Sequence, residues 1–127
     1  MNSLICEGEY LEDLQRNGLK IIQPRKGYRF AADSVILAHF AGDSPLAGTV
    51  VDLGTGSGII LLLLSALCPD AKLIGVEIQE TSADRARRSV ALNNLNSSIE
   101  IIHGDLRNVS SYINGGSVEA VVSLSLI

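Results

Sequence analysis

Apolar residues in the second half of the chain form short continuous runs, separated by turns and by longer segments of helical periodicity. Runs without polar residues at alternate positions are typical of parallel strands buried on both faces. Strands are expected at Thr49–Leu53, Lys72–Val76, Ile99–His103 and Val118–Leu124, and helices at Ile59–Cys68 and Glu80–Leu95. This alternation predicts an α/β fold with about four parallel strands and flanking helices.

The first part of the chain has a different pattern. We expect residues 1–44 to form a short segment that packs over the functional site, and residues 45–127 to form the main domain. A strand is expected at Leu19–Gln23, a turn at Pro24–Gly27 and a helix at about Val35–Phe40. Proline and glycine delimit the turn because neither continues a strand readily. Asp33 or Ser34 is a suitable cap for the helix.

Composition narrows the classes of function. With 127 residues, 46% of them hydrophobic, and a formal net charge of −4, the chain suits one globular domain rather than a disordered or strongly basic protein. A local basic face would still allow an RNA partner. The cysteines, Cys6 and Cys68, form no metal-binding spacing. The N-terminus lacks a signal-peptide pattern, and no apolar run reaches the ~20 residues of a membrane span, so a cytoplasmic location is expected.

The stretch VVDLGTGSGII, residues 50–60, is the strongest functional signal. Its glycines follow a predicted strand and open a predicted helix, and an acid, Glu77, ends the next strand. A glycine turn in this position with an acid on the neighbouring strand is typical of nucleotide-type sites, in which the acid binds ribose hydroxyls. A tight strand-to-helix connection without a ligand is the alternative interpretation.

The glycine spacing separates two classes of ligand. A dinucleotide fingerprint requires glycine at its sixth position, where this chain has Ile59 when counted from Gly54. A carboxylate at Asp52 would also repel a pyrophosphate in a poorly solvated cleft. The same carboxylate suits S-adenosylmethionine, which has an ammonium, a sulfonium and a ribose but no phosphate. Bare glycine backbone would let such a ligand approach closely.

The residues at this point resemble a known family. DLGTGSG at 52–58, VEIQ at 76–79 and HGDLRN at 103–108 look like motifs of the class I S-adenosylmethionine-dependent methyltransferases. The upstream stretch LQRNGLKIIQPRKGYRFAADSVILAHFA, residues 14–41, is similar to the segment before the cofactor motif in the small-domain group of bacterial tRNA1(Val) adenine N6-methyltransferases. The resemblance implies a partial Rossmann-like fold, corresponding to the N-terminal part of such an enzyme.

The resemblance also implies roles for individual residues in binding S-adenosylmethionine or its product S-adenosylhomocysteine. These are Asp52, Gly54, Thr55, Gly56 and Gly58 beside the methionine part, Glu77 at the ribose, Ile78, Asp105 and Leu106 around the adenine, and Phe30 and Asp33 in a segment that folds over the cofactor. Several polar residues of the chain can also be explained without a ligand. Asp33 suits a helix cap and Asp105 a turn, while His39 and His103 suit the edge of the core and Arg85, Arg87 and Arg88 a solvated helix face.

The resemblance ends after the last predicted strand. In the resembled group this strand leads into Asn-Pro-Pro-Tyr, whose carbonyl oxygens accept the protons of the target amine while the aromatic ring stacks on the base. Here the chain reads Leu124-Ser125-Leu126-Ile127, so no catalytic residue is assigned. Three explanations of this difference are open: an experimental truncation, a frameshifted or shortened gene product, or a stand-alone cofactor-binding half. The first two are favoured.

Two hypotheses of function follow, with a weaker third. The first is a methyltransferase whose parent modifies an adenine exocyclic amine in tRNA. The second is a non-catalytic S-adenosylmethionine-binding or interaction module, and the third is an NAD-dependent oxidoreductase. The last strand is expected to be an open sheet edge, at which Val118, Val121 and Val122 face no partner and a homodimer could form.

Overall fold

The computed structural model describes residues 4–26, 37–39, 47–111, 113 and 118–123. Its regular elements are β1 (Glu9–Asp13), β2 (Lys20–Pro24), β3 (Thr49–Leu53), α2 (Ile59–Leu67), β4 (Lys72–Glu77), α3 (Glu80–Leu92), β5 (Ile99–His103), the 3-10 helix η1 (Leu106–Ser111) and β6 (Val118–Ser123). Phe30, Asp33 and most of the predicted helix at Val35–Phe40 lie outside the described residues.

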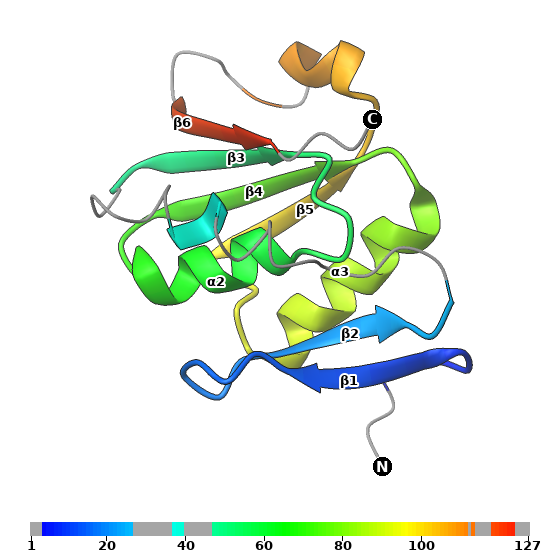
Figure 1. Ribbon diagram of the computed structural model, residues 1–127. Coiled ribbons are helices and arrows are strands. Elements are labelled where there is room, and N and C mark those ends of the chain that lie inside the picture. The colour runs from blue at the N-terminus through cyan, green and yellow to red at the C-terminus, as the bar shows by residue number, and fades with distance from the viewer. Residues whose placement is uncertain (1–3, 27–36, 40–46, 112, 114–117, 124–127) are drawn as a thin grey trace.

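The main sheet has four parallel strands in the order β5-β4-β3-β6. Helices α2 and α3 cover one face, and η1 lies on the opposite face (Figure 1). This arrangement confirms the predicted α/β fold and the positions of its strands. Helix α3 ends three residues earlier than predicted, because Asn94 has a φ of 58° and so leaves the helical region.

The core lies mainly between the sheet and the two helices. Six consecutive residues of α2, from Ile59 to Leu64, are buried, because the helix is enclosed by the sheet on one side and by other apolar side chains around it. A helix that is apolar on nearly all sides requires such an environment. The opposite face of the sheet has a smaller apolar cluster of Val51, Ile74, Val76 and Ile113. Apolar packing on both faces therefore supports the sheet that carries the glycine turn.

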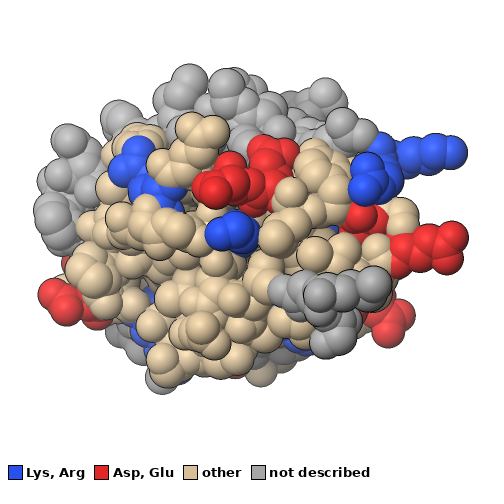
Figure 2. All heavy atoms as spheres, turned by 90° about the horizontal axis from the view of Figure 1, so that it is seen from below, with Lys and Arg blue, Asp and Glu red and all other residues tan. Residues whose placement is uncertain are grey.

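The N-terminal segment contains a β-hairpin, of which only one strand was predicted. Strand β1 pairs antiparallel with β2, with Glu9 opposite Pro24 and Asp13 opposite Lys20. The stretch EYLED carries three acids and lacks a clear apolar face, so its sequence gives little sign of a strand. Figure 2 views the molecule from the hairpin side, where acidic and basic side chains are interspersed on a largely uncharged surface.

The hairpin packs against α3, which supplies side chains in place of a third strand. Asn93 accepts a hydrogen bond from the Lys20 N–H at 2.9 Å and donates one to the Lys20 carbonyl at 2.6 Å. One turn earlier on α3, the Ser89 hydroxyl accepts the Ile22 N–H at 2.9 Å. These bonds satisfy backbone groups on the edge of β2 that does not face β1, and they fix the hairpin on the helix.

Arg85 and Arg88 do not form the solvated helix face that was predicted. Arg85 Nε donates to Glu9 Oε2 at 2.9 Å, and Arg88 Nη2 donates to the same oxygen at 2.8 Å. The two arginine side chains are largely buried, and the Glu9 side chain is only 5% exposed. Their partner lies more than 70 residues earlier in the chain, so the pattern on the helix alone could not indicate it.

The last described strand, β6, pairs only with β3 among the described residues, which confirms that it is an edge of the sheet. Val121 is 57% exposed, as expected for an open edge. Val122 corrects the prediction, because it is 8% exposed and belongs to the main core cluster on the helix-covered face. In the described part of the chain, no helix has the length and apolar character needed to cross a membrane.

Candidate cofactor site

The glycine turn connects β3 to α2 at the carboxyl edge of the sheet. Gly54, Gly56 and Gly58 have φ values of 73°, 58° and 90°, which disfavour residues with a Cβ. The N–H groups of Gly54 and Thr55 both donate to the Val76 carbonyl, at 2.8 and 3.1 Å. The turn is therefore tied to the end of β4, at the carboxyl edge of the sheet, where ligands of open α/β sheets bind.

Glu77 links the glycine turn to the start of α3. Its Oε1 accepts the Gly56 N–H at 2.8 Å, and its Oε2 accepts the Gln79 N–H at 2.9 Å. The Glu77 residue is buried, at the last position of β4. One carboxylate thus fixes both the loop and the helix that follow neighbouring strands. Each oxygen retains a second lone pair for a ligand.

Asp52 is the most unusual polar group of the site. It is 1% exposed, and neither carboxylate oxygen has a hydrogen-bond partner among the described residues. Burial raises the pKa of Asp52 to about 7, an effect that the nearby Thr55 hydroxyl opposes and the Glu77 charge increases. The Thr55 hydroxyl is also buried, and it too has no hydrogen-bond partner among the described residues. It lies close enough to Asp52 to lower the Asp52 pKa, but the two groups are not well aligned for a hydrogen bond.

Gly75 supports the site and was not predicted as part of it. It lies opposite Asp52 in the β3–β4 register. A Cβ at this position would lie 2.7 Å from Leu61 Cδ1 and 2.9 Å from Thr55 Cβ, closer than carbon atoms can approach. The glycine turn therefore packs directly onto the backbone of β4. A glycine inside an otherwise apolar strand was the available signal for such a close approach.

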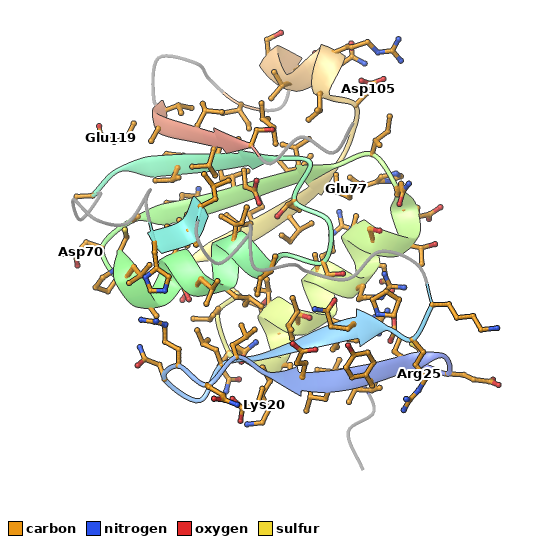
Figure 3. All side chains as sticks on the ribbon, viewed as in Figure 1. Lys20, Arg25, Asp70, Glu77, Asp105 and Glu119 are labelled. Carbon is orange, nitrogen blue, oxygen red and sulfur yellow. The ribbon has the colours of Figure 1, made fainter. Side chains whose placement is uncertain are left out.

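The predicted adenine-binding residues lie after β4 and β5. Ile78 and Leu106 are exposed apolar side chains, and the Gly104 N–H ties the loop after β5 to the Glu77 carbonyl at 2.9 Å. Asp105 pairs with Arg107 at 2.6 Å, and this guanidinium lowers the pKa of the Asp105 carboxyl. Figure 3 shows Asp105 and Glu77 at the same end of the sheet, opposite Asp70 and Glu119.

His103, which was predicted to be a residue at the edge of the core, is exposed and lies 3.0 Å from the Ile78 carbonyl through its Nε2. His39 is buried only in part and its Nε2 lies 2.9 Å from Arg16 Nη2. Neither histidine is brought to the glycine turn by a described contact. The structure therefore gives no reason to treat either one as a base or a ligand.

A cleft of about 430 Å³ runs beside Glu77. Its lining includes three of the predicted cofactor-binding residues, together with residues of the hairpin and of α3. The lining residues are Pro24, Lys26, Gly54, Gly56, Ser57, Glu77, Gln79, Thr81, Ser82 and Arg85. Of these, Lys26 and Arg85 were predicted only as parts of a charged turn and a solvated helix face. The other described residues of the predicted site do not line this cleft: Asp52 is on β3, Thr55 and Gly58 are in the turn after it, Ile78 follows β4, and Asp105 and Leu106 follow β5.

Comparisons with known proteins identify the family. A methyltransferase domain model matches residues 50–127. A tRNA1(Val) (adenine(37)-N6)-methyltransferase of Porphyromonas gingivalis is 35% identical over 101 residues, which are 75% of this chain and 39% of the relative. A ribosomal protein L11 methyltransferase of Clostridium perfringens is 40% identical over 62 residues, 48% of this chain and 19% of the relative.

The fold agrees with these matches. A S-adenosyl-L-methionine-dependent methyltransferase from Thiobacillus denitrificans, solved with S-adenosyl-L-homocysteine, superposes with a TM-score of 0.60 at 20% identity, covering 80% of this chain and 40% of that one. The matched part of the chain spans about two fifths of the Porphyromonas gingivalis and Thiobacillus denitrificans proteins and about one fifth of the Clostridium perfringens enzyme. Because the domain model covers more than half of the chain, this protein belongs to the class I S-adenosylmethionine-dependent methyltransferase family.

Proposed function

We propose that this chain binds S-adenosylmethionine at the carboxyl edge of β3 and β4, as the cofactor-binding part of a methyltransferase. The observation that carries the proposal is the Asp52 carboxylate, which is buried beside the glycine turn without a described hydrogen-bond donor. An unpartnered buried carboxylate is unfavourable. A ligand with an ammonium group would supply both the missing charge and the missing donors, whereas a dinucleotide pyrophosphate would add repulsion.

The other residues of the site complement the rest of the cofactor in this proposal. The free lone pairs of Glu77 accept the ribose hydroxyls, and the exposed side chains of Ile78 and Leu106 cover the adenine. Asp105 accepts the adenine amino group, for which it would exchange part of its pairing with Arg107. Phe30 and Asp33, outside the described residues, remain predicted contacts from the segment over the cofactor.

The reaction that we propose for the whole protein is methylation of an adenine exocyclic amine in tRNA. The cofactor supplies the electrophilic methyl group, so the protein contributes chiefly by orienting the two reactants. The proposal is supported by the similarity to the Porphyromonas gingivalis enzyme and by the upstream stretch at 14–41. A homodimer through the β6 edge stays a prediction. A sedimentation profile that changes with protein concentration is the measurement that tests it.

The alternative is a module that binds the cofactor and transfers no methyl group. It rests on the sequence at Leu124–Ile127, which differs from the Asn-Pro-Pro-Tyr of the resembled group. Membership of the methyltransferase family favours the enzyme for the whole protein. A methyl-transfer assay with bulk tRNA separates the two. We expect little or no transfer by the 127-residue chain itself.

Titration calorimetry with S-adenosylhomocysteine tests the cofactor proposal directly. We expect binding by the wild-type chain and at least tenfold weaker binding after Asp52→Ala or Glu77→Ala. Asp70→Asn is the matched control, because Asp70 is an exposed acid at the other end of the sheet (Figure 3). A folded wild-type chain that binds NAD and not S-adenosylhomocysteine would contradict the proposal.

A further inference from the structure

The N-terminal hairpin forms one wall of the cleft beside Glu77. Pro24 is the last residue of β2 and Lys26 follows shortly after it, and both line the cleft. Arg85, from the second turn of α3, lines the same cleft. The shape of the cleft therefore depends on how closely the end of the hairpin is held against the start of α3.

Arg85 contacts the cleft and the hairpin at the same time. Its Nε donates to Glu9 Oε2 at 2.9 Å, and Glu9 lies directly opposite Pro24 in the hairpin register. Arg88 donates to both Glu9 oxygens, and the Cys6 N–H donates to Glu9 Oε1 at 2.9 Å. The Glu9 carboxylate is thus buried with a full set of donors. Loss of one partner from such a group is strongly unfavourable, because the remaining charges stay buried.

The hairpin is held to α3 by two kinds of contact, namely hydrogen bonds from its backbone to Ser89 and Asn93 and the ionic cluster around Glu9. The Asn93 side chain binds the backbone of Lys20, at the end of β2 remote from the cleft. The cluster of Glu9, Arg85 and Arg88 acts at the other end, where Pro24 lines the cleft. Weakening the ionic cluster should therefore release the end of the hairpin at the cleft, while the Asn93 and Ser89 hydrogen bonds keep the rest of β2 on the helix.

We infer that the Glu9–Arg85–Arg88 cluster is a positioning device for the cofactor cleft, through which docking of the N-terminal hairpin and binding of the cofactor are coupled. The inference rests on the proposed cofactor site. Coupling of this kind is reciprocal. If the docked hairpin improves cofactor binding, the bound cofactor must also stabilise the docked hairpin by the same factor.

Glu9→Gln is the variant that tests the inference, since it removes the charge and keeps the size of the side chain. We expect S-adenosylhomocysteine affinity, measured by calorimetry, to fall about five- to thirtyfold. Hydrogen exchange supplies a second readout. In the wild type, the ligand should slow the exchange of amides in β1 and β2, and in Glu9→Gln this slowing should be lost.

Asp84→Asn is the matched control, because Asp84 pairs with the same Arg88 on the exposed side of α3 at 2.9 Å. We expect it to change affinity less than twofold. Arg85→Gln is the second variant, for the case in which Glu9→Gln does not fold. In Arg85→Gln the charge of Glu9 is still neutralised by Arg88. This variant should weaken binding by at least threefold and reduce the slowing of exchange in the hairpin.

The outcomes separate this inference from the proposed function. A folded wild type that does not bind S-adenosylhomocysteine would overturn the proposed function, and the inference with it. Normal wild-type binding that neither Glu9→Gln nor Arg85→Gln weakens would overturn the inference alone. Unweakened binding together with faster amide exchange in the hairpin of Glu9→Gln would mean that the hairpin covers the protein without influencing the cleft.

Discussion

Glu77 accepts the backbone N–H of Gly56 at 2.8 Å, so the acid that the sequence marks as a ribose ligand also holds the glycine turn in place. The second oxygen of Glu77 does the same for Gln79, which precedes α3. The two loops that enclose the carboxyl edge of β3 and β4 are therefore joined by one side chain. A substitution at this position should affect stability as well as ligand binding.

The first prediction concerns Glu77→Gln. The new amide can accept only through its oxygen, so one of the two backbone N–H groups, of Gly56 or Gln79, loses its acceptor. We expect the free energy of unfolding to fall by about 1–3 kcal/mol, the cost of an unsatisfied buried donor. Urea denaturation measures the loss. Glu100→Gln is the control, because Glu100 is exposed on β5, and an equal effect of both substitutions would contradict the argument.

The second prediction concerns Gly75→Ala. The added methyl group would overlap Leu61 Cδ1 and Thr55 Cβ, at 2.7 and 2.9 Å. Overpacking of this kind costs about 1–3 kcal/mol. We expect lower stability together with weaker S-adenosylhomocysteine binding, because Thr55 belongs to the glycine turn.

A double mutant tests whether the overlap causes the loss. Leu61→Ala removes one of the two overlapping groups at the expense of a cavity in the core. The free-energy losses of Gly75→Ala and Leu61→Ala should therefore sum to more than the loss of the double mutant. Strict additivity in urea denaturation would show that the methyl group is accommodated elsewhere.

The sheet and its helices could be predicted because β3 and β4 are almost continuously apolar, β5 and β6 are mostly so, and α2 is apolar on nearly every side. The end of α3 could not, since it depends on the positive φ of Asn94. Strand β1 was missed because its sequence is acidic, and the residues that neutralise its buried Glu9, Arg85 and Arg88, lie on α3. Local patterns cannot indicate a partner that lies so far along the chain.

The candidate site also contains residues that local sequence predicts and residues that it does not. The glycine turn and Glu77 follow from motif spacing, because the turn must come directly between a strand and a helix. Arg85 and Lys26 enter the cleft through tertiary packing of the hairpin, which no spacing encodes. Gly75 carried a usable signal, since a glycine inside a buried strand indicates close packing against its α-carbon.

The third prediction is a loss of folding stability in acid through protonation of Glu9. The guanidinium of Arg88, together with the other donors around Glu9, lowers the pKa of Glu9 to about 2, against an ordinary value of 4.5. A lowered pKa stabilises the fold above the ordinary value, and this contribution disappears as the pH falls from about 4.5 to 2. It amounts to at most about 3 kcal/mol.

Urea denaturation between pH 2.5 and 7 measures this contribution. Glu9→Gln should be less stable than wild type at pH 7, and the difference should shrink as the pH approaches 2. Glu7→Gln is a suitable control, because Glu7 is exposed in the turn before β1. A difference between wild type and Glu9→Gln that stays constant with pH would rule out ionisation of Glu9 as its cause.

The fourth prediction has the opposite sign and concerns Asp52. Its pKa is about 7 in the fold, against an ordinary value of 3.8, because burial disfavours the charged form. Between these values the unfolded chain loses its proton and the folded chain keeps it, so stability falls as the pH rises from about 4 to 7. The full penalty, at most about 4 kcal/mol, is present above pH 7.

Asp52→Asn removes this penalty together with the charge. We therefore expect the variant to match the wild type at pH 4 and to be more stable at pH 8, as measured by urea denaturation. The ammonium group of the ligand favours the ionised carboxylate, so wild-type affinity for S-adenosylhomocysteine should fall as the pH drops below 7, by up to tenfold per unit. Asp52→Asn should bind weakly with no such slope. Equal slopes in the two proteins would exclude Asp52 as the group that recognises the cation.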